Sequence, residues 1–206
     1  MKFKNSALDV INTLCNYVVL NIVFLITCIP VITIGASLTA LYSVTMREAR
    51  GEYGYLVRTY IKEFKNNIKQ GTQAFLIIAG LALVFSFNFF FWKALESPLG
   101  SIIMTLMLIF MFVLLCVIAY TFPLLARFEN TTLQTLKNAI GLCFANVKAT
   151  GALILIEAFV FFLAYFSSPF RILLVLFGFA FIAYVQSYVL VKVFEPYEKP
   201  QTCIQE

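Results

Sequence analysis

Residues 102–120 read IIMTLMLIFMFVLLCVIAY, and the charge-free stretch around them extends from residue 97 to residue 126. A helix that crosses a bilayer needs about 20 mostly apolar residues. A strand of a membrane β-barrel would instead alternate apolar and polar residues over a short segment. The unbroken apolar run therefore predicts a transmembrane helix at about residues 101–125.

Further apolar runs occur along the whole chain. Residues 10–46, 70–92 and 172–191 contain no Asp, Glu, Lys or Arg, and Glu157 is the only such residue within 149–170. Charged residues make up 12% of the sequence, about half the usual share in a soluble protein, and the mean hydropathy is +0.92. We therefore predict an all-α, polytopic membrane protein with one domain, residues 1–206. Its five spans are expected at about 10–31, 72–92, 101–125, 150–166 and 172–192.

The basic residues are unevenly distributed between the predicted spans. The net charge is +5, and the connections 93–100 and 166–171 each contain one basic residue. Most of the others lie in the connections after the first and third spans: Arg47, Arg50, Arg58, Lys62, Lys65, Lys69, Arg127, Lys137 and Lys148. The positive-inside rule places these two connections and the C-terminus in the cytoplasm. The N-terminus is then outside, or inside if residues 36–46 re-enter the bilayer.

The two basic connections, about 36–70 and 130–148, are predicted to form amphipathic segments. In the first, apolar residues recur at helical spacing, namely Tyr53, Leu56, Tyr60, Phe64 and Ile68. A second face contains Arg58, Lys62, Lys65 and Lys69. This pattern predicts either a cytoplasmic interfacial helix with its cations toward anionic headgroups or a helix packed on the protein's own spans. The second connection repeats the pattern more weakly, and both helices are expected to continue into the span that follows.

A short similarity links these two connections. FKNNIKQG (64–71) and FANVKATG (144–151) share Phe, Asn and Gly at the same spacing, and each precedes a predicted hairpin of two spans. We therefore hypothesise a tandem repeat of an interfacial helix plus a helical hairpin, with both copies in the same orientation. Such copies would be related by rotation about the membrane normal.

The sequence offers little for catalysis. It contains no His, and no GxxxxGK[ST], GxGxxG, GxSxG or HExxH pattern. The five Cys residues form no CxxC pair, and four of them lie in or beside apolar segments, where Cys acts as a small hydrophobic residue. We therefore expect no enzymatic activity, no cofactor and no metal site. The positive-inside rule accounts for the basic balance, so nucleic-acid binding is not expected.

A few polar residues within the predicted spans are candidates for function. Glu157 is the only acidic residue inside a span, where charged groups commonly face a cavity or a partner. It is interpreted either as a proton, cation or salt-bridge site or as a hydrogen-bonded structural group. Asp9, Asn12 and Asn16 share one helix face with Asn5. This stripe predicts either hydrogen bonds between helices or the lining of a polar pathway.

The segment PVITIG (30–35) interrupts the first apolar run. It occurs once, lacks the second Gly of a potassium-type filter and has no following Lys, so neither an ion filter nor a phosphate site is predicted. Pro30 is expected to end or kink the first span, and Thr33 to act as a cap. Gly35 is expected to allow a close backbone approach or a positive φ. A second, shorter helix should then end at Gly51.

These residues resemble the YesL family of bacterial integral membrane proteins. The similarity lies in Pro30-x-x-Thr33-x-Gly35, in Ala40-Leu41-Tyr42, in the following Arg-x-x-x-Gly stretch and in FKNNIKQG (64–71). Where many relatives have Pro after the Gly, this chain has Ala36. The resemblance implies a multi-pass protein of the bacterial plasma membrane with undefined molecular function, commonly encoded near carbohydrate ABC importers. It implies no catalytic or binding residues.

Two functions are therefore expected. The first is a non-enzymatic accessory or regulatory component associated with carbohydrate (ABC-type) uptake, whose partners are the bilayer and its anionic headgroups, ABC importer subunits or other membrane proteins. The alternative is a small transporter or channel with a polar intramembrane pathway that includes Glu157, Asn12 and Asn16. The two differ in whether these residues line one continuous hydrated cavity.

Overall fold

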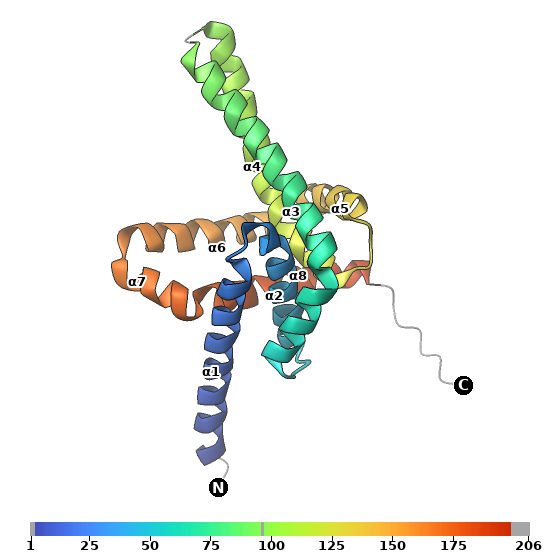
Figure 1. Cartoon of the computed structure of the whole chain (residues 1–206), viewed down its shortest axis with the longest axis vertical. Coiled ribbons are helices and arrows are strands. Elements are labelled where there is room, and N and C mark those ends of the chain that lie inside the picture. The colour runs from blue at the N-terminus through green and yellow to red at the C-terminus, as the bar shows by residue number, and fades with distance from the viewer. Residues whose placement is uncertain (1–2, 96, 199–206) are drawn as a thin grey trace, which may run out of the picture.

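The structure, a computed structural model, describes residues 3–95 and 97–198, and its regular elements are all helical, as predicted (Figure 1). The first half contains α1 (Phe3–Cys28), the 3-10 turn η1 (Val31–Thr33), α2 (Ile34–Ala49) and α3 (Leu56–Ala94). The second half contains α4 (Pro98–Arg127), α5 (Thr132–Ala145), α6 (Val147–Phe166), α7 (Ser168–Leu173), the π-helical turn η2 (Leu174–Gly178), α8 (Phe179–Phe194) and the 3-10 turn η3 (Glu195–Tyr197).

Within the described residues, four helical segments are long and apolar enough to cross a membrane. They are Leu56–Ala94, Pro98–Arg127, Val147–Phe166 and Ser168–Tyr197, and Thr13–Cys28 of α1 adds a shorter apolar helix. Only 11% of the most apolar stretch of each of the first three is buried by the rest of the chain. Water would strongly disfavour so much exposed apolar surface, whereas lipid accommodates it. The chain is therefore a multi-pass membrane protein.

Helix α2 lies at the centre of the fold. It follows α1 through η1, returns beside it, and contacts α1, α3, α4 and α8 (Figure 1). Nearly every side chain from residue 35 to residue 46 is buried. Residues 36–46 are therefore packed inside the bundle and do not form the exposed amphipathic segment that was predicted, whereas their re-entry into the bilayer stays a prediction. Small residues such as Ala36, Ser37 and Ala40 allow the neighbouring helices to approach α2 closely.

The two short connections form the predicted tight hairpins. The hydroxyl of Ser97 accepts a hydrogen bond from the backbone N–H of Gly100 (3.0 Å), and that of Ser167 accepts one from the N–H of Phe170 (3.4 Å). Pro98 and Pro169 lie in the first turn of α4 and α7, where proline needs no hydrogen-bond partner for its nitrogen. Each hairpin thus turns on a Ser cap followed by Pro.

The amphipathic segments behave differently from one another. Residues 56–69 form the start of the 39-residue α3, which continues unbroken into the span for about 58 Å in all. This confirms the expected continuity between the basic segment and the span that follows it. In the second half, α5 ends and α6 begins at Asn146, whose φ of −120° and ψ of 53° interrupt the helix. Here the predicted continuity is wrong.

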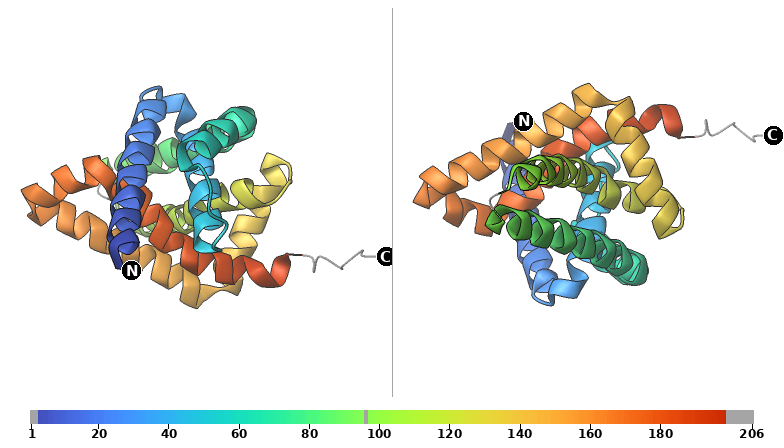
Figure 2. Two further views of the ribbon diagram at one scale, coloured as in Figure 1. Left: turned by 90° about the horizontal axis from the view of Figure 1, so that it is seen from below. Right: turned by 90° about the horizontal axis from the view of Figure 1, so that it is seen from above.

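The two hairpins project from the central bundle in different directions. The α3–α4 hairpin extends along the longest axis of the molecule, whereas the hairpin of α6 with α7 and α8 extends sideways from it, and the views from above and below agree (Figures 1 and 2). The two halves share the order of their elements, and the tandem repeat with both copies in the same orientation stays a prediction.

Candidate functional site

The turn after α1 has the predicted break but a different cap. Pro30 follows the end of α1, and η1 connects it to α2. The hydroxyl of Thr33 makes no cap to α2 and instead donates to the carbonyls of Thr27 and Pro30, both at 2.7 Å. Thr33 therefore satisfies carbonyl groups that the end of α1 leaves free. Helix α2 ends as predicted, because Gly51 has a φ of +77°.

Gly35 allows a close backbone approach, which is one of the two predicted roles. A Cβ atom at Gly35 would lie 2.1 Å from the carbonyl oxygen of Gly71, and one at Gly71 would lie 2.7 Å from Cα of Ala36. Neither space exists for a side chain, so α2 and α3 cross with their backbones in contact. This crossing positions the basic start of α3 beside the end of α2.

Glu157 takes part in a hydrogen-bonded chain that runs from the bundle centre to the surface of α6. The Gln186 amide donates to Oε1 of Glu157 (2.8 Å), and the Tyr42 hydroxyl donates to Oε1 of Gln186 (2.5 Å). Tyr42 and Gln186 are buried, whereas Glu157 is exposed on the side of α6. This arrangement matches the interpretation of Glu157 as a hydrogen-bonded group. It also gives one chain of polar side chains that leads from Tyr42 in α2 through Gln186 in α8 to Glu157 in α6.

The stripe on α1 lies elsewhere. Asn16 is exposed and lines an open cavity of about 460 Å³ with Tyr55 and Arg58, and Glu157 is not among the residues that line it. Asp9 and Asn12 lie in the first part of α1, outside the side chains that the structure describes. The structure thus does not bring Asn16 and Glu157 together.

Asn21 is a buried polar residue whose role the sequence did not indicate. Its side-chain nitrogen donates to the Val175 carbonyl (2.7 Å) and, more weakly, to the Leu174 carbonyl, and its oxygen accepts from the N–H of Ala180 (3.0 Å). These groups lie in and next to the π-helical turn η2. A π-bulge breaks the regular hydrogen-bond ladder, and Asn21 supplies side-chain bonds to the backbone groups at this break. Asn21 is off the predicted stripe, and its partner could not be read from spacing.

The predicted basic face on α3 is present. Arg58, Lys62, Lys65 and Lys69 are all exposed. The opposite face is partly as predicted, since Leu56 and Tyr60 are buried and Phe64 packs against the core, whereas Tyr53 and Ile68 are exposed. This segment therefore packs on the protein's own bundle and presents its cations outward.

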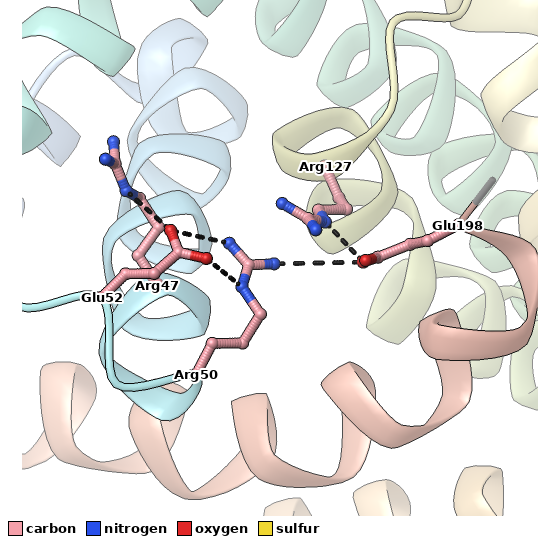
Figure 3. Close-up of polar contacts among 5 residues, drawn as sticks. All are labelled: Arg47, Arg50, Glu52, Arg127 and Glu198. Carbon is pink, nitrogen blue, oxygen red and sulfur yellow. Dashed lines mark hydrogen bonds and ion pairs between the residues drawn. The ribbon is translucent and has the colours of Figure 1, made fainter. Parts of the chain in front are cut away.

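An ion-pair network, which we call the arginine cluster, joins three elements at the end of α2. It consists of Arg47, Arg50, Glu52, Arg127 and Glu198 (Figure 3). Arg50 is 2.8 Å from Glu52 and 4.0 Å from Glu198, and Arg127 is 2.6 Å from Glu198. The cluster thus connects α2, the end of α4 and the segment after α8.

The carboxylates of the cluster are held in their charged form. The hydrogen bond from Arg127 lowers the pKa of Glu198 below its ordinary value of 4.5, helped by the positive charges of Arg127 and Arg50. The hydrogen bond from Arg50 lowers the pKa of Glu52 in the same way. The arginine cluster is therefore a charged site at neutral pH, with three cations facing two anions.

A polar cavity of about 240 Å³ opens beside the arginine cluster. Ser43, Met46, Arg47, Arg50, Glu52, Glu63, Ala126 and Arg127 line it. Arg47 is about half exposed, so its guanidinium remains available to a carboxylate or phosphate outside the chain. Arg50 is mostly buried and serves to connect the two carboxylates. The cluster can therefore recognise a charged partner group.

The comparison with protein families gives a match to the first half of the chain. Residues 17–89 match the model of a family described as a protein of unknown function, DUF624. This region runs from Tyr17 in α1 through the turn, the buried helix α2 and the Gly35–Gly71 crossing, and ends within α3. Comparison with curated proteins and with solved structures gives no match.

Proposed function

We propose that this membrane protein is a non-enzymatic accessory or regulatory component associated with carbohydrate (ABC-type) uptake, and that it acts by contacting importer subunits. The link to importers rests on the resemblance of residues 28–71 to the YesL family. The observation that carries the choice between accessory protein and transporter is the separation of Glu157 from Asn16.

The polar groups of the interior support this proposal because they bond to one another. The buried Gln186 bonds to both Tyr42 and Glu157, and the hydroxyls of the buried Ser187 and Thr45 are 2.8 Å apart. On the other side of α2, the hydroxyl of Thr27 lies 2.6 Å from that of Tyr60. Side chains that bond across helices stabilise a membrane bundle, and groups already paired offer a solute few free sites.

The arginine cluster supplies the surface for a partner. Arg47 of the cluster is partly exposed at the end of α2. Two further exposed cations, Arg58 and Lys62, follow in the sequence at the start of α3. Charged groups at the rim of an interface chiefly determine which partner binds and how fast. We assign this surface to a partner subunit with carboxylates at its membrane-proximal face.

The test is affinity purification of the tagged full-length chain in a mild detergent, with the importer's membrane subunit quantified in the eluate. Wild type should recover this subunit. Arg47→Gln should recover less of it, while Lys93→Gln, a control at the tip of the α3–α4 hairpin, should match wild type. Failure of the wild-type chain to recover any importer subunit would overturn the proposal.

A small transporter remains the second candidate because one observation favours it. The chain Tyr42–Gln186–Glu157 connects the buried helix α2 to the surface of α6, which is the kind of route that a proton relay uses. Replacement of Glu157 separates the two functions, because a relay needs its ionisable group and an accessory protein does not.

A further inference from the structure

A second cavity, which we call the α5 pocket, lies between the end of α4, one face of α5 and the end of α8. Its volume is about 450 Å³, within the range of small-molecule sites. The lining residues are Leu124, Phe128, Asn130, Lys137, Asn138, Gly141, Leu142, Ala145, Phe194 and Tyr197. The arginine cluster and the polar chain of Glu157 use none of these side chains.

The walls of the α5 pocket are apolar and rigidly held. The rings of Phe128 and Phe194 meet edge to face with their centroids 5.6 Å apart, and Leu124 and Leu142 are buried. The ion pair between Arg127 and Glu198 fixes the adjacent chain segments. The pocket is therefore preformed and suited to a hydrocarbon group.

The rim of the α5 pocket is polar and carries one type of charge. Lys137 is the only charged residue among those that line it, and Asn130 and Asn138 add amide groups. Gln70 donates to the backbone carbonyl of Asn130, which holds this part of the rim to α3. A ligand that fits has an apolar part for the walls and an anionic group for Lys137.

The surface around the pocket indicates where such a ligand comes from. The outward side of α5 exposes Leu133, Ile140 and Phe144, and α5 lies directly between the candidate spans α4 and α6 in the chain. Exposed apolar residues next to membrane spans are in contact with lipid, so the pocket opens beside the bilayer.

We propose that the α5 pocket binds an anionic lipid, with an acyl chain against Phe128, Ala145 and Tyr197 and the headgroup beside Lys137. This inference does not depend on the proposed link to an importer. A membrane phospholipid and a free fatty acid both have this chemistry, since each combines a hydrocarbon chain with an anionic group.

Gly141 provides a variant that fills the pocket without disturbing the fold. It lines the pocket, is exposed, and has no atom within 4 Å of the position of an added Cβ. Gly141→Leu should therefore keep or raise thermal stability, because leucine favours a helix by somewhat under 1 kcal/mol over glycine. Gly80→Leu in α3, where an added Cβ also meets nothing, is the matched control.

The experiment is native mass spectrometry of the full chain after delipidation and re-addition of phosphatidylglycerol, phosphatidylcholine or oleate. Wild type and Gly80→Leu should retain one molecule of phosphatidylglycerol or oleate in preference to phosphatidylcholine. Preference for phosphatidylglycerol identifies the ligand as a phospholipid, and preference for oleate identifies it as a free fatty acid. Gly141→Leu should lose this retention. Lys137→Gln should weaken it about fivefold, and Lys148→Gln should leave it unchanged.

Three results would overturn the proposal. The first is that wild type retains phosphatidylcholine as well as it retains the two anionic lipids. The second is that Gly141→Leu retains the anionic lipid as wild type does, and the third is that Lys137→Gln does so. If Gly141→Leu does not fold, the comparison of Lys137→Gln with Lys148→Gln still decides the question.

Discussion

Gly35 and Gly71 bring helices α2 and α3 into direct backbone contact. A Cβ atom on Gly35 would be 2.1 Å from the carbonyl oxygen of Gly71, far inside any allowed distance. The pair fixes how the buried helix α2 sits against the longest helix of the chain. It lies within the region that matches the DUF624 model, and it positions the arginine cluster relative to the basic face of α3.

Adding one methyl group at this crossing should separate the two helices. Gly71→Ala is expected to lower stability by about 1–3 kcal/mol, because the added atom would overlap the backbone of Ala36. The measurement is the thermal unfolding temperature of the protein in detergent. Gly80→Ala is the control and should be neutral or stabilising, since it adds helix propensity in open space. Equal melting temperatures for the two variants would contradict the close crossing.

The sequence predicted the helical class, the apolar runs and both hairpin turns because each depends on local composition. It also predicted the break at Pro30, and the close backbone approach was one of the two roles expected of Gly35. It did not predict that residues 36–46 would form the buried centre, because Ala, Ser, Thr and Leu are equally suited to a surface or a packed helix. The break at Asn146 has no Pro or Gly to mark it.

The site was predictable only in part. Isolation within an apolar run identified Glu157. Its partner Gln186 lies 29 residues away along the chain, and Tyr42, which bonds to Gln186, lies 115 residues from Glu157, so packing brings the three together. The arginine cluster joins Arg50, Arg127 and Glu198 from three elements. The positive-inside rule assigned Arg50 and Arg127 to one side of the membrane. It could not show that both arginines form ion pairs with Glu198. Asn21 likewise acts on a π-helical turn that no sequence pattern announces.

The bonds of Asn21 predict a large effect for a nearly isosteric change. Asn21→Leu should leave the carbonyl of Val175 and the N–H of Ala180 without their partner, which costs about 1–3 kcal/mol for each buried group. The melting temperature in detergent should fall clearly. Asn88→Leu is the matched control, because the side-chain amide of Asn88 donates to the carbonyl of Val84 in its own helix. A fall no larger than that of Asn88→Leu would show that the π-turn does not need Asn21.

Acid should loosen the arginine cluster. The pKa of Glu198 is lower in the folded protein than its ordinary value of 4.5, so its contribution to stability is complete above that value and is lost as the pH falls through the lower, folded pKa. Because the pair is partly exposed, the contribution should be less than about 1 kcal/mol. Melting curves between pH 7 and pH 3 measure it.

The Glu198→Gln variant isolates this contribution. It removes the titrating group, so it should be slightly less stable than wild type at pH 7 and should lose less stability on acidification. Arg127→Gln should have a similar effect, because it removes the other partner of the 2.6 Å contact. Identical pH dependence in wild type and Glu198→Gln would mean that this ion pair contributes nothing to the fold.

The Glu157 side chain allows a substitution that keeps its hydrogen bond. Glu157→Gln retains an oxygen to accept from the Gln186 amide, so stability should remain within about 0.5 kcal/mol of wild type. Glu157→Leu should be less stable, because the mostly buried Gln186 then has a free donor. The difference in melting temperature between the two variants tests whether this bond exists in the folded protein.

The most direct test of the accessory function is carbohydrate uptake by cells that lack the protein and carry either the wild-type or the Glu157→Gln gene. Loss of the protein should reduce importer-dependent uptake, and both genes should restore it equally. Failure of Glu157→Gln to restore uptake, with the variant folded and present in the membrane at wild-type levels, would contradict the account and favour a transporter that uses this carboxylate.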